Sequence, residues 1–100
     1  MFILLTKRLA RSLIRTRIRL IAVTLLVTVG VFILWLGWFG FNGGSQLAIG
    51  TADDAIAVST IFLNTFLAGA GGVMAAATVT RLNFGKTDVV QMLNGCIGGL

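Results

Sequence analysis

The sequence predicts an all-α, helical integral membrane protein, and two features of its composition carry that prediction. Hydrophobic residues make up 57% of the chain and charged residues only 11%, whereas soluble domains carry about 25% charged residues. A chain this short cannot bury so many apolar side chains in a core of its own. Residues 20–41 and 55–80 also contain no charged residue, and about 20 apolar residues are enough to cross a bilayer as a helix. The lipid bilayer is therefore the predicted surrounding.

Residues 1–19 form a basic amphipathic N-terminal flank. It holds six of the eight basic residues: Lys7, Arg8, Arg11, Arg15, Arg17 and Arg19. On a helix, four of these recur every fourth residue along one face, which suits a helix lying on an anionic membrane surface. A signal or transit sequence shows similar charge, but the apolar run that follows exceeds the ~7–15 residues of a signal core, so we expect a retained anchor. We expect no nucleic-acid partner, because the cations flank an apolar span.

Residues 20–100 form the predicted transmembrane region, with helices at about 20–42 and 54–80. The first run, residues 20–41, reaches roughly 33 Å as a helix, which matches a hydrocarbon core of about 30 Å. Trp35 and Trp38 lie near its far end, where interfacial aromatic residues are common. A glycine-containing break follows, and we expect Asp53 and Asp54 to cap the second helix; attracting cations is the alternative role.

The second helix is rich in small residues, which favours contact with protein rather than lipid. Small-xxx-small spacing suits close helix contacts at two glycine pairs, Gly40/Gly44 and Gly95/Gly99. Asn64 and Asn94 lie inside apolar helices, where an amide is expected to hydrogen-bond to a neighbouring helix. Residues 88–100 begin a third apolar segment that is too short to cross a bilayer, so we expect a span cut short.

Charge also predicts orientation and excludes several functions. A basic flank stays inside, which puts the N-terminus, Arg81 and Lys86 in the cytoplasm and Asp53 and Asp54 outside, in a multi-pass protein of the cell membrane. The chain has no histidine and one cysteine, Cys96, so nothing indicates a cofactor, a metal site or a disulfide. Its three aspartates form no plausible catalytic pair, and we expect no enzyme.

Residues 37–45, GWFGFNGGS, are the stretch that suggests chemistry. Three aromatic rings and several glycines end the first span, and a hydroxyl, Ser45, lies just beyond. Aromatic faces attract cations by about 0.5–2 kcal/mol, and a hydroxyl oxygen accepts a hydrogen bond from an ammonium N–H. On physical grounds alone, an interfacial aromatic belt is the favoured explanation.

The sequence resembles the ammonium transporter (Amt/MEP/Rh) family. The resemblance rests on GWFGFNGGS preceded by FILWL, on FLNT and FLAGAGG in the next helix, on Gly85–Lys86 in the loop, and on LNGCIGGL at the end. It covers about residues 31–100 and implies the sixth to eighth helices of an eleven-helix fold. Such proteins assemble as homotrimers and act as channels for ammonium or ammonia.

The resemblance also implies residue roles. Ser45 is similar to the serine of an external ammonium recruitment site, and Phe41 to one of two phenylalanines that gate the pore. Trp38 is similar to a tryptophan of the same vestibule, where packing is favoured over binding, and Asn42 to a structural helix end. Without the resemblance, Ser45 would be a solvated loop residue and Phe41 a lipid-facing or packing residue.

The chain departs from the family in several respects. The family's pore histidines and the partners of the external site belong to helices that are absent here, and residues 1–30 show no family pattern. We therefore expect a partial ammonium transporter that is not competent alone. The alternative is a small membrane hairpin that acts as an interaction or structural subunit.

Overall fold

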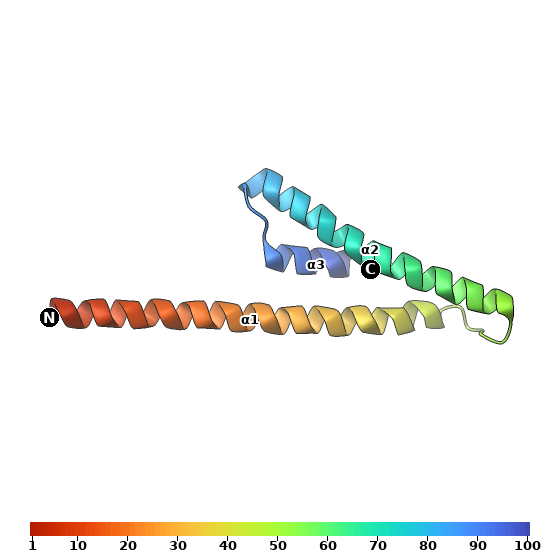
Figure 1. Ribbon diagram of the computed structural model, residues 1–100, viewed down its shortest axis with the longest axis horizontal. Helices are drawn as coiled ribbons and strands as arrows, with labels where there is room; N and C mark the ends of the chain where they lie inside the picture. Colours follow the sequence, from red (N-terminus) through yellow and green to blue (C-terminus); the bar gives the residue numbers. More distant parts are fainter.

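The structure, a computed structural model that describes residues 1–100, consists of three helices and no strand. They are α1 (Phe2–Gly44), α2 (Ala52–Phe84) and α3 (Val89–Gly99). Figure 1 shows α1 and α2 as an antiparallel hairpin, with α3 folded back beside α2. The predicted all-α fold is confirmed.

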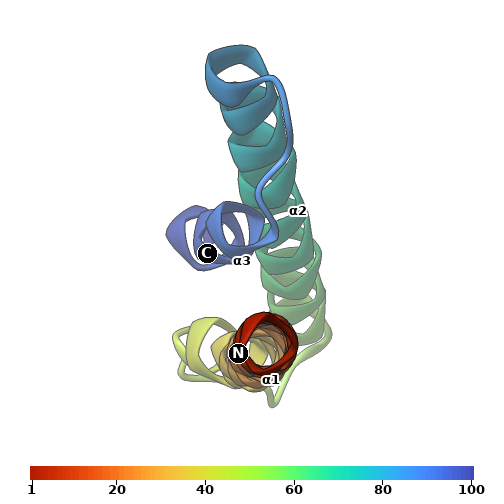
Figure 2. The ribbon, with the colours of Figure 1, turned by 90° about the vertical axis from the view of Figure 1, so that its left-hand side faces the viewer.

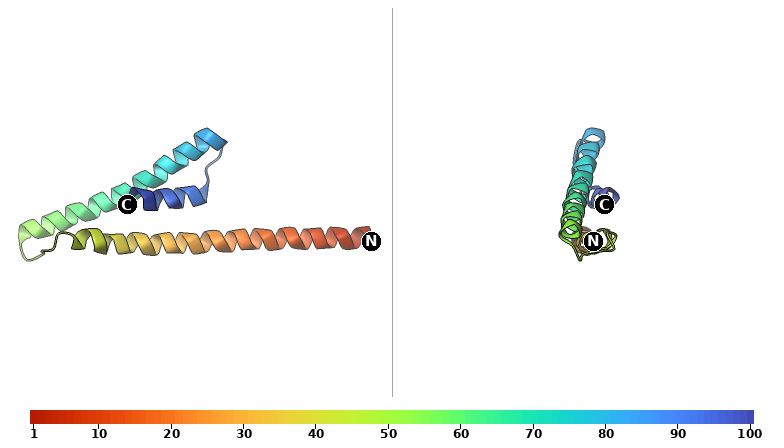
Figure 3. Two further views of the ribbon diagram at one scale, coloured as in Figure 1. Left: turned by 180° about the vertical axis from the view of Figure 1, so that it is seen from behind. Right: turned by 90° about the vertical axis from the view of Figure 1, so that its right-hand side faces the viewer.

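The hairpin is long and thin, measuring 77 × 28 × 12 Å, and Figure 3 shows this from behind and from one end. Only 6 of 100 residues are buried. Two helices, α1 and α2, are long and apolar enough to span a membrane, and few of their residues are covered by protein. Their apolar side chains therefore need lipid or further protein around them.

Helix α1 runs without a break through the basic flank and the apolar span. The charge pattern predicted a helix that starts near residue 20 and a flank that lies on the membrane surface. The structure instead has one helix of 43 residues, about 65 Å long. Figure 2 looks roughly along its axis, with the first turn in front and the last turns displaced to one side. Residues 1–29 contain neither proline nor glycine, so nothing there favours a kink. The sequence changes from basic to apolar near residue 20, but the helix does not begin or end there.

Helix α2 begins in a capping box and is longer than expected at both ends. The Thr51 hydroxyl accepts from the Asp54 N–H at 3.1 Å, and the Asp54 carboxylate accepts from the Thr51 N–H at 3.1 Å. The N-cap residue is thus Thr51, and of the two aspartates only Asp54 takes part in the capping box, while Asp53 lies exposed in the first turn. The helix ends at Phe84 and is capped by Gly85, whose φ of 72° is left-handed, a conformation that glycine adopts without strain.

Helices α2 and α3 meet backbone to backbone. A Cβ built on Gly95 would lie 2.6 Å from the Cβ of Ala76, and one built on Gly72 would overlap the carbonyl of Gly95. Gly99 packs in the same way against the Ala68 carbonyl. The predicted close contact at Gly95/Gly99 is therefore confirmed, since any side chain there would push the helices apart. At the other predicted pair, Gly40/Gly44, no atom lies within 4 Å of the added Cβ.

We predict that Gly95→Ala destabilises the α2–α3 contact by about 1–3 kcal/mol, because the added methyl group has no room. Gly98→Ala is the matched control, since a Cβ on Gly98 meets nothing within 4 Å. Unfolding of the detergent-solubilised protein by sodium dodecyl sulfate would measure both. Equal stability of the two variants would contradict the packing described here.

Candidate functional site

The three residues that the sequence singled out lie along one side of the last turns of α1. Trp38, Phe41 and Ser45 are separated by three and four residues, the spacing that places side chains on one helix face. Trp38 is half-buried, whereas Phe41 is 75% exposed and Ser45 is exposed. The structure therefore places these three side chains along one helix face and leaves Phe41 and Ser45 exposed.

The Ser45 hydroxyl has a defined hydrogen bond. Its Oγ donates to the backbone carbonyl of Phe41 at 3.0 Å. Because a hydroxyl has one proton and two lone pairs, this bond commits the proton and leaves the oxygen as an acceptor. In this state Ser45 suits a ligand that donates N–H bonds.

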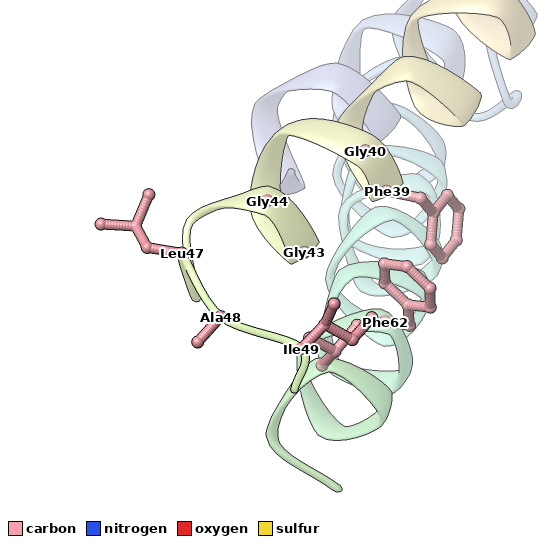
Figure 4. A pocket seen from close by; sticks show the side chains of 9 residues that line it. Phe39, Gly40, Gly43, Gly44, Leu47, Ala48, Ile49 and Phe62 are labelled. Carbon is pink, nitrogen blue, oxygen red and sulfur yellow. The ribbon is translucent and has the colours of Figure 1, made fainter. Parts of the chain in front are cut away.

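A cavity of about 400 Å³ opens on a different side of the same helix end. Its lining contains no polar side chain and comprises Phe39, Gly40, Gly43, Gly44, Leu47, Ala48, Ile49, Val58 and Phe62. Figure 4 shows the rings of Phe39 and Phe62 facing each other beside the glycines, edge to face with 5.7 Å between centroids. None of the three predicted site residues lines this cavity, and its side chains offer nothing to a cation beyond the ring faces.

A hydrogen bond between helices fixes the rotation of this end of α1. The Asn42 amide donates to the hydroxyl of Thr65 on α2 at 3.0 Å, and Thr65 is only 4% exposed. Asn42 directly follows Phe41, so the bond also determines where Phe41 and Ser45 point. The expected interhelical bonds from Asn64 and Asn94 are absent within this chain, because both amides are exposed and bond to no group of it.

Aromatic stacking holds the helices together below this bond. The Trp35 ring stacks on Phe66 at 5.7 Å and on Phe32 at 6.1 Å, and it lies against Gly69, whose added Cβ would come within 2.9 Å of it. Trp35 thus packs between helices rather than in the interfacial belt suggested by its position. Its indole Nε1 is buried without an acceptor, a cost of about 1–3 kcal/mol that the ring packing must offset. The spacing of Phe62 and Phe66, one turn apart on α2, was a signal that sequence reasoning did not use.

The two carboxylates at this end, Asp53 and Asp54, differ in whether they are already hydrogen-bonded. Hydrogen bonding by the Thr51 hydroxyl, and then by Gln46, lowers the pKa of Asp54, which precedes the charge-free run of α2. Because Asp54 is committed to the cap, Asp53 is the carboxylate left to attract cations. No three His, Cys, Asp or Glu side chains lie close enough together to hold a metal ion.

Comparison with known proteins relates the whole chain to one family. The profile of the Ammonium Transporter Family matches residues 1–100, including the first 30 residues, where the sequence alone showed no family pattern. Ammonium transporter Amt2 of Archaeoglobus fulgidus is 47% identical over 72 residues, which are 72% of this chain and 14% of the relative.

Two other relatives give a similar result. A putative ammonium transporter of Synechocystis is 44% identical over 75 residues, covering 73% of this chain and 17% of its own length. Ammonium transporter 1 of Dictyostelium discoideum is 40% identical over 75 residues, which cover 75% of this chain and 15% of the relative. The chain therefore spans about one sixth of the length of these relatives or less. No solved structure matches it.

We predict that Asn42 and Thr65 are energetically coupled by about 0.6 kcal/mol, the average for hydrogen bonds between membrane helices. A double-mutant cycle of Asn42→Ala and Thr65→Ala, with stability measured in detergent, would give this value. The pair Asn64→Ala and Thr65→Ala is the control, because Asn64 bonds to no group in the chain. Coupling in the control pair, or no coupling between Asn42 and Thr65, would show that this hydrogen bond does not fix the rotation of α1.

Proposed function

Because this chain belongs to the ammonium transporter family, we propose that it forms part of a transmembrane path for ammonium or ammonia. The family match over residues 1–100 is the observation that carries this proposal. Matches to named transporters favour it over the alternative of a small interaction hairpin. The apolar helices and the family together make the chain a multi-pass membrane protein.

We place the outer mouth of that path at the end of α1. Along the helix axis, Phe41 lies about 6 Å below Ser45 and Trp38 about 10 Å below it. A cation that donates an N–H bond to Ser45 therefore meets the Phe41 ring one turn further in, where the ring face attracts it. Ser45 is the proposed recruiting group, Phe41 the proposed gate, and Trp38 the packing neighbour that supports both.

The charges support an orientation in the cell membrane with the N-terminus in the cytoplasm. In Figure 1 the end of α2 and the turn after it lie toward the same end of the hairpin as the basic part of α1. Arg81 belongs to the last turn of α2, and Lys86 belongs to the turn that follows. All eight basic residues thus belong to one end, and the first turn of α2 at the other end carries Asp53 and Asp54. Positive residues remain on the cytoplasmic side. The resemblance further suggests the sixth to eighth helices of a homotrimeric ammonium channel.

A chimera tests the proposed mouth. Residues 31–100 would replace the matching segment of the Archaeoglobus transporter in cells that lack ammonium transport, and methylammonium uptake would be measured. We expect uptake, and we expect Ser45→Ala to raise its KM by about tenfold or more, because an ionic hydrogen bond is lost.

Ser59→Ala is the matched control for that substitution. Ser59 is also exposed on a helix, and its hydroxyl bonds to the carbonyl of Ala55 at 2.8 Å, one turn back, just as Ser45 does. Equal effects of the two variants would count against Ser45 as the recruiting group. A chimera that reaches the membrane in normal amount without uptake would count against the function itself.

The 100-residue chain expressed alone is expected to give no methylammonium uptake. It has no histidine, and the resemblance assigns conduction to pore histidines on other helices. Uptake assays on cells producing only this chain would check the point, and saturable uptake would show that the histidines are not required.

A further inference from the structure

We propose that the basic part of α1 binds anionic lipid headgroups in two tiers, an inner tier in direct contact and an outer tier acting through screened attraction. The inner tier is Arg15, Arg17 and Arg19, and the outer tier is Lys7, Arg8 and Arg11. This proposal does not depend on ammonium transport, because it uses no residue of the proposed path.

The six cations lack counter-ions within the chain. All six are exposed, and the chain has only three carboxylates. Asp53 and Asp54 belong to the far end of the hairpin, and Asp88 caps α3, where it accepts from two backbone N–H groups. An uncompensated positive segment of this density attracts anionic partners outside the chain.

The shape of α1 places this basic segment next to the lipid headgroups. Figure 1 shows α1 as one unbroken helix whose first turns extend past the ends of both α2 and α3. The apolar run of residues 20–41 fills the hydrocarbon layer, so the helix leaves that layer near Arg19. The whole basic segment therefore extends outward from the edge of the hydrocarbon layer along the axis of α1.

The rise of the helix then divides the cations into two tiers. The headgroup layer of one leaflet is about 5–7 Å thick, and Arg17 and Arg15 lie about 3 and 6 Å beyond Arg19. These three are within reach of lipid phosphates and form charge-assisted hydrogen bonds with them. Arg11 lies about 12 Å out and Lys7 about 18 Å, so the outer tier acts across a Debye length of about 8 Å.

Exposed apolar side chains favour a lipid partner over a nucleic acid or an acidic protein. Leu13, Ile14 and Ile18 alternate with the inner tier and are 64%, 56% and 60% exposed. A membrane interface accepts apolar and basic side chains together, whereas a phosphate backbone in water would cover only the basic ones.

Two triple variants of the full chain test the tiers at equal loss of charge. The inner variant is R15Q/R17Q/R19Q and the outer variant is K7Q/R8Q/R11Q, both reconstituted in equimolar phosphatidylcholine and phosphatidylglycerol vesicles. Spin-labelled lipids report how strongly phosphatidylglycerol is enriched beside the protein. We expect the inner variant to lose the enrichment and the outer variant to keep most of it. In about 1 M salt, where the Debye length is about 3 Å, wild type and outer variant should become equal.

A third variant guards against failure to insert. R15K/R17K/R19K keeps the charge and should keep the enrichment even if the glutamine variant is poorly folded by circular dichroism. Equal losses in the inner and outer variants would overturn the two tiers. No enrichment in the wild type, or its displacement by polyadenylate added outside the vesicles, would overturn lipid as the partner.

Discussion

The helix contacts on which this structure depends are possible only because glycine has no side chain at the points of closest approach. Gly69 receives the Trp35 ring, Gly43 lies under the Phe62 ring, and Gly72 meets the backbone of Gly95 directly. A chain with so few buried residues has no large core to define its packing, so these close approaches determine how the helices sit. Without a hydrophobic force between helices in lipid, such packing and a few hydrogen bonds supply the association energy.

This packing has a direct consequence for the outer mouth. The face of α1 that contacts α2 carries Trp35 and Asn42, and the bond from Asn42 to Thr65 closes the contact at its outer end. Phe41 and Ser45 are consequently turned away from that contact and remain exposed. The aromatic and hydroxyl groups proposed to handle ammonium thus owe their direction to residues that need not touch it.

The sequence predicted what depends on local patterns and charge. Charge-free runs located the two long helices, the acidic pair located the start of α2, and the family resemblance agreed with the later comparisons. It did not predict that α1 continues through residues 1–19, because positive charge says where a helix meets water and does not end the helix. It could not choose between the glycine pairs at 40/44 and 95/99, since spacing shows which residues share a face and not what lies opposite. The partner of Asn42 was hidden for the same reason, and the roles of Trp38, Phe41 and Ser45 remain predictions.

The most direct test of a path for ammonium that opens at Ser45 is the charge displaced when ammonium reaches proteoliposomes on a supported membrane. The vesicles would carry the chimera that contains residues 31–100. A saturable, ammonium-evoked current that potassium does not reproduce, and that weakens at low ammonium when Ser45 is replaced by alanine, is the predicted result. No current, at a protein density where the parent transporter gives one, would contradict the account.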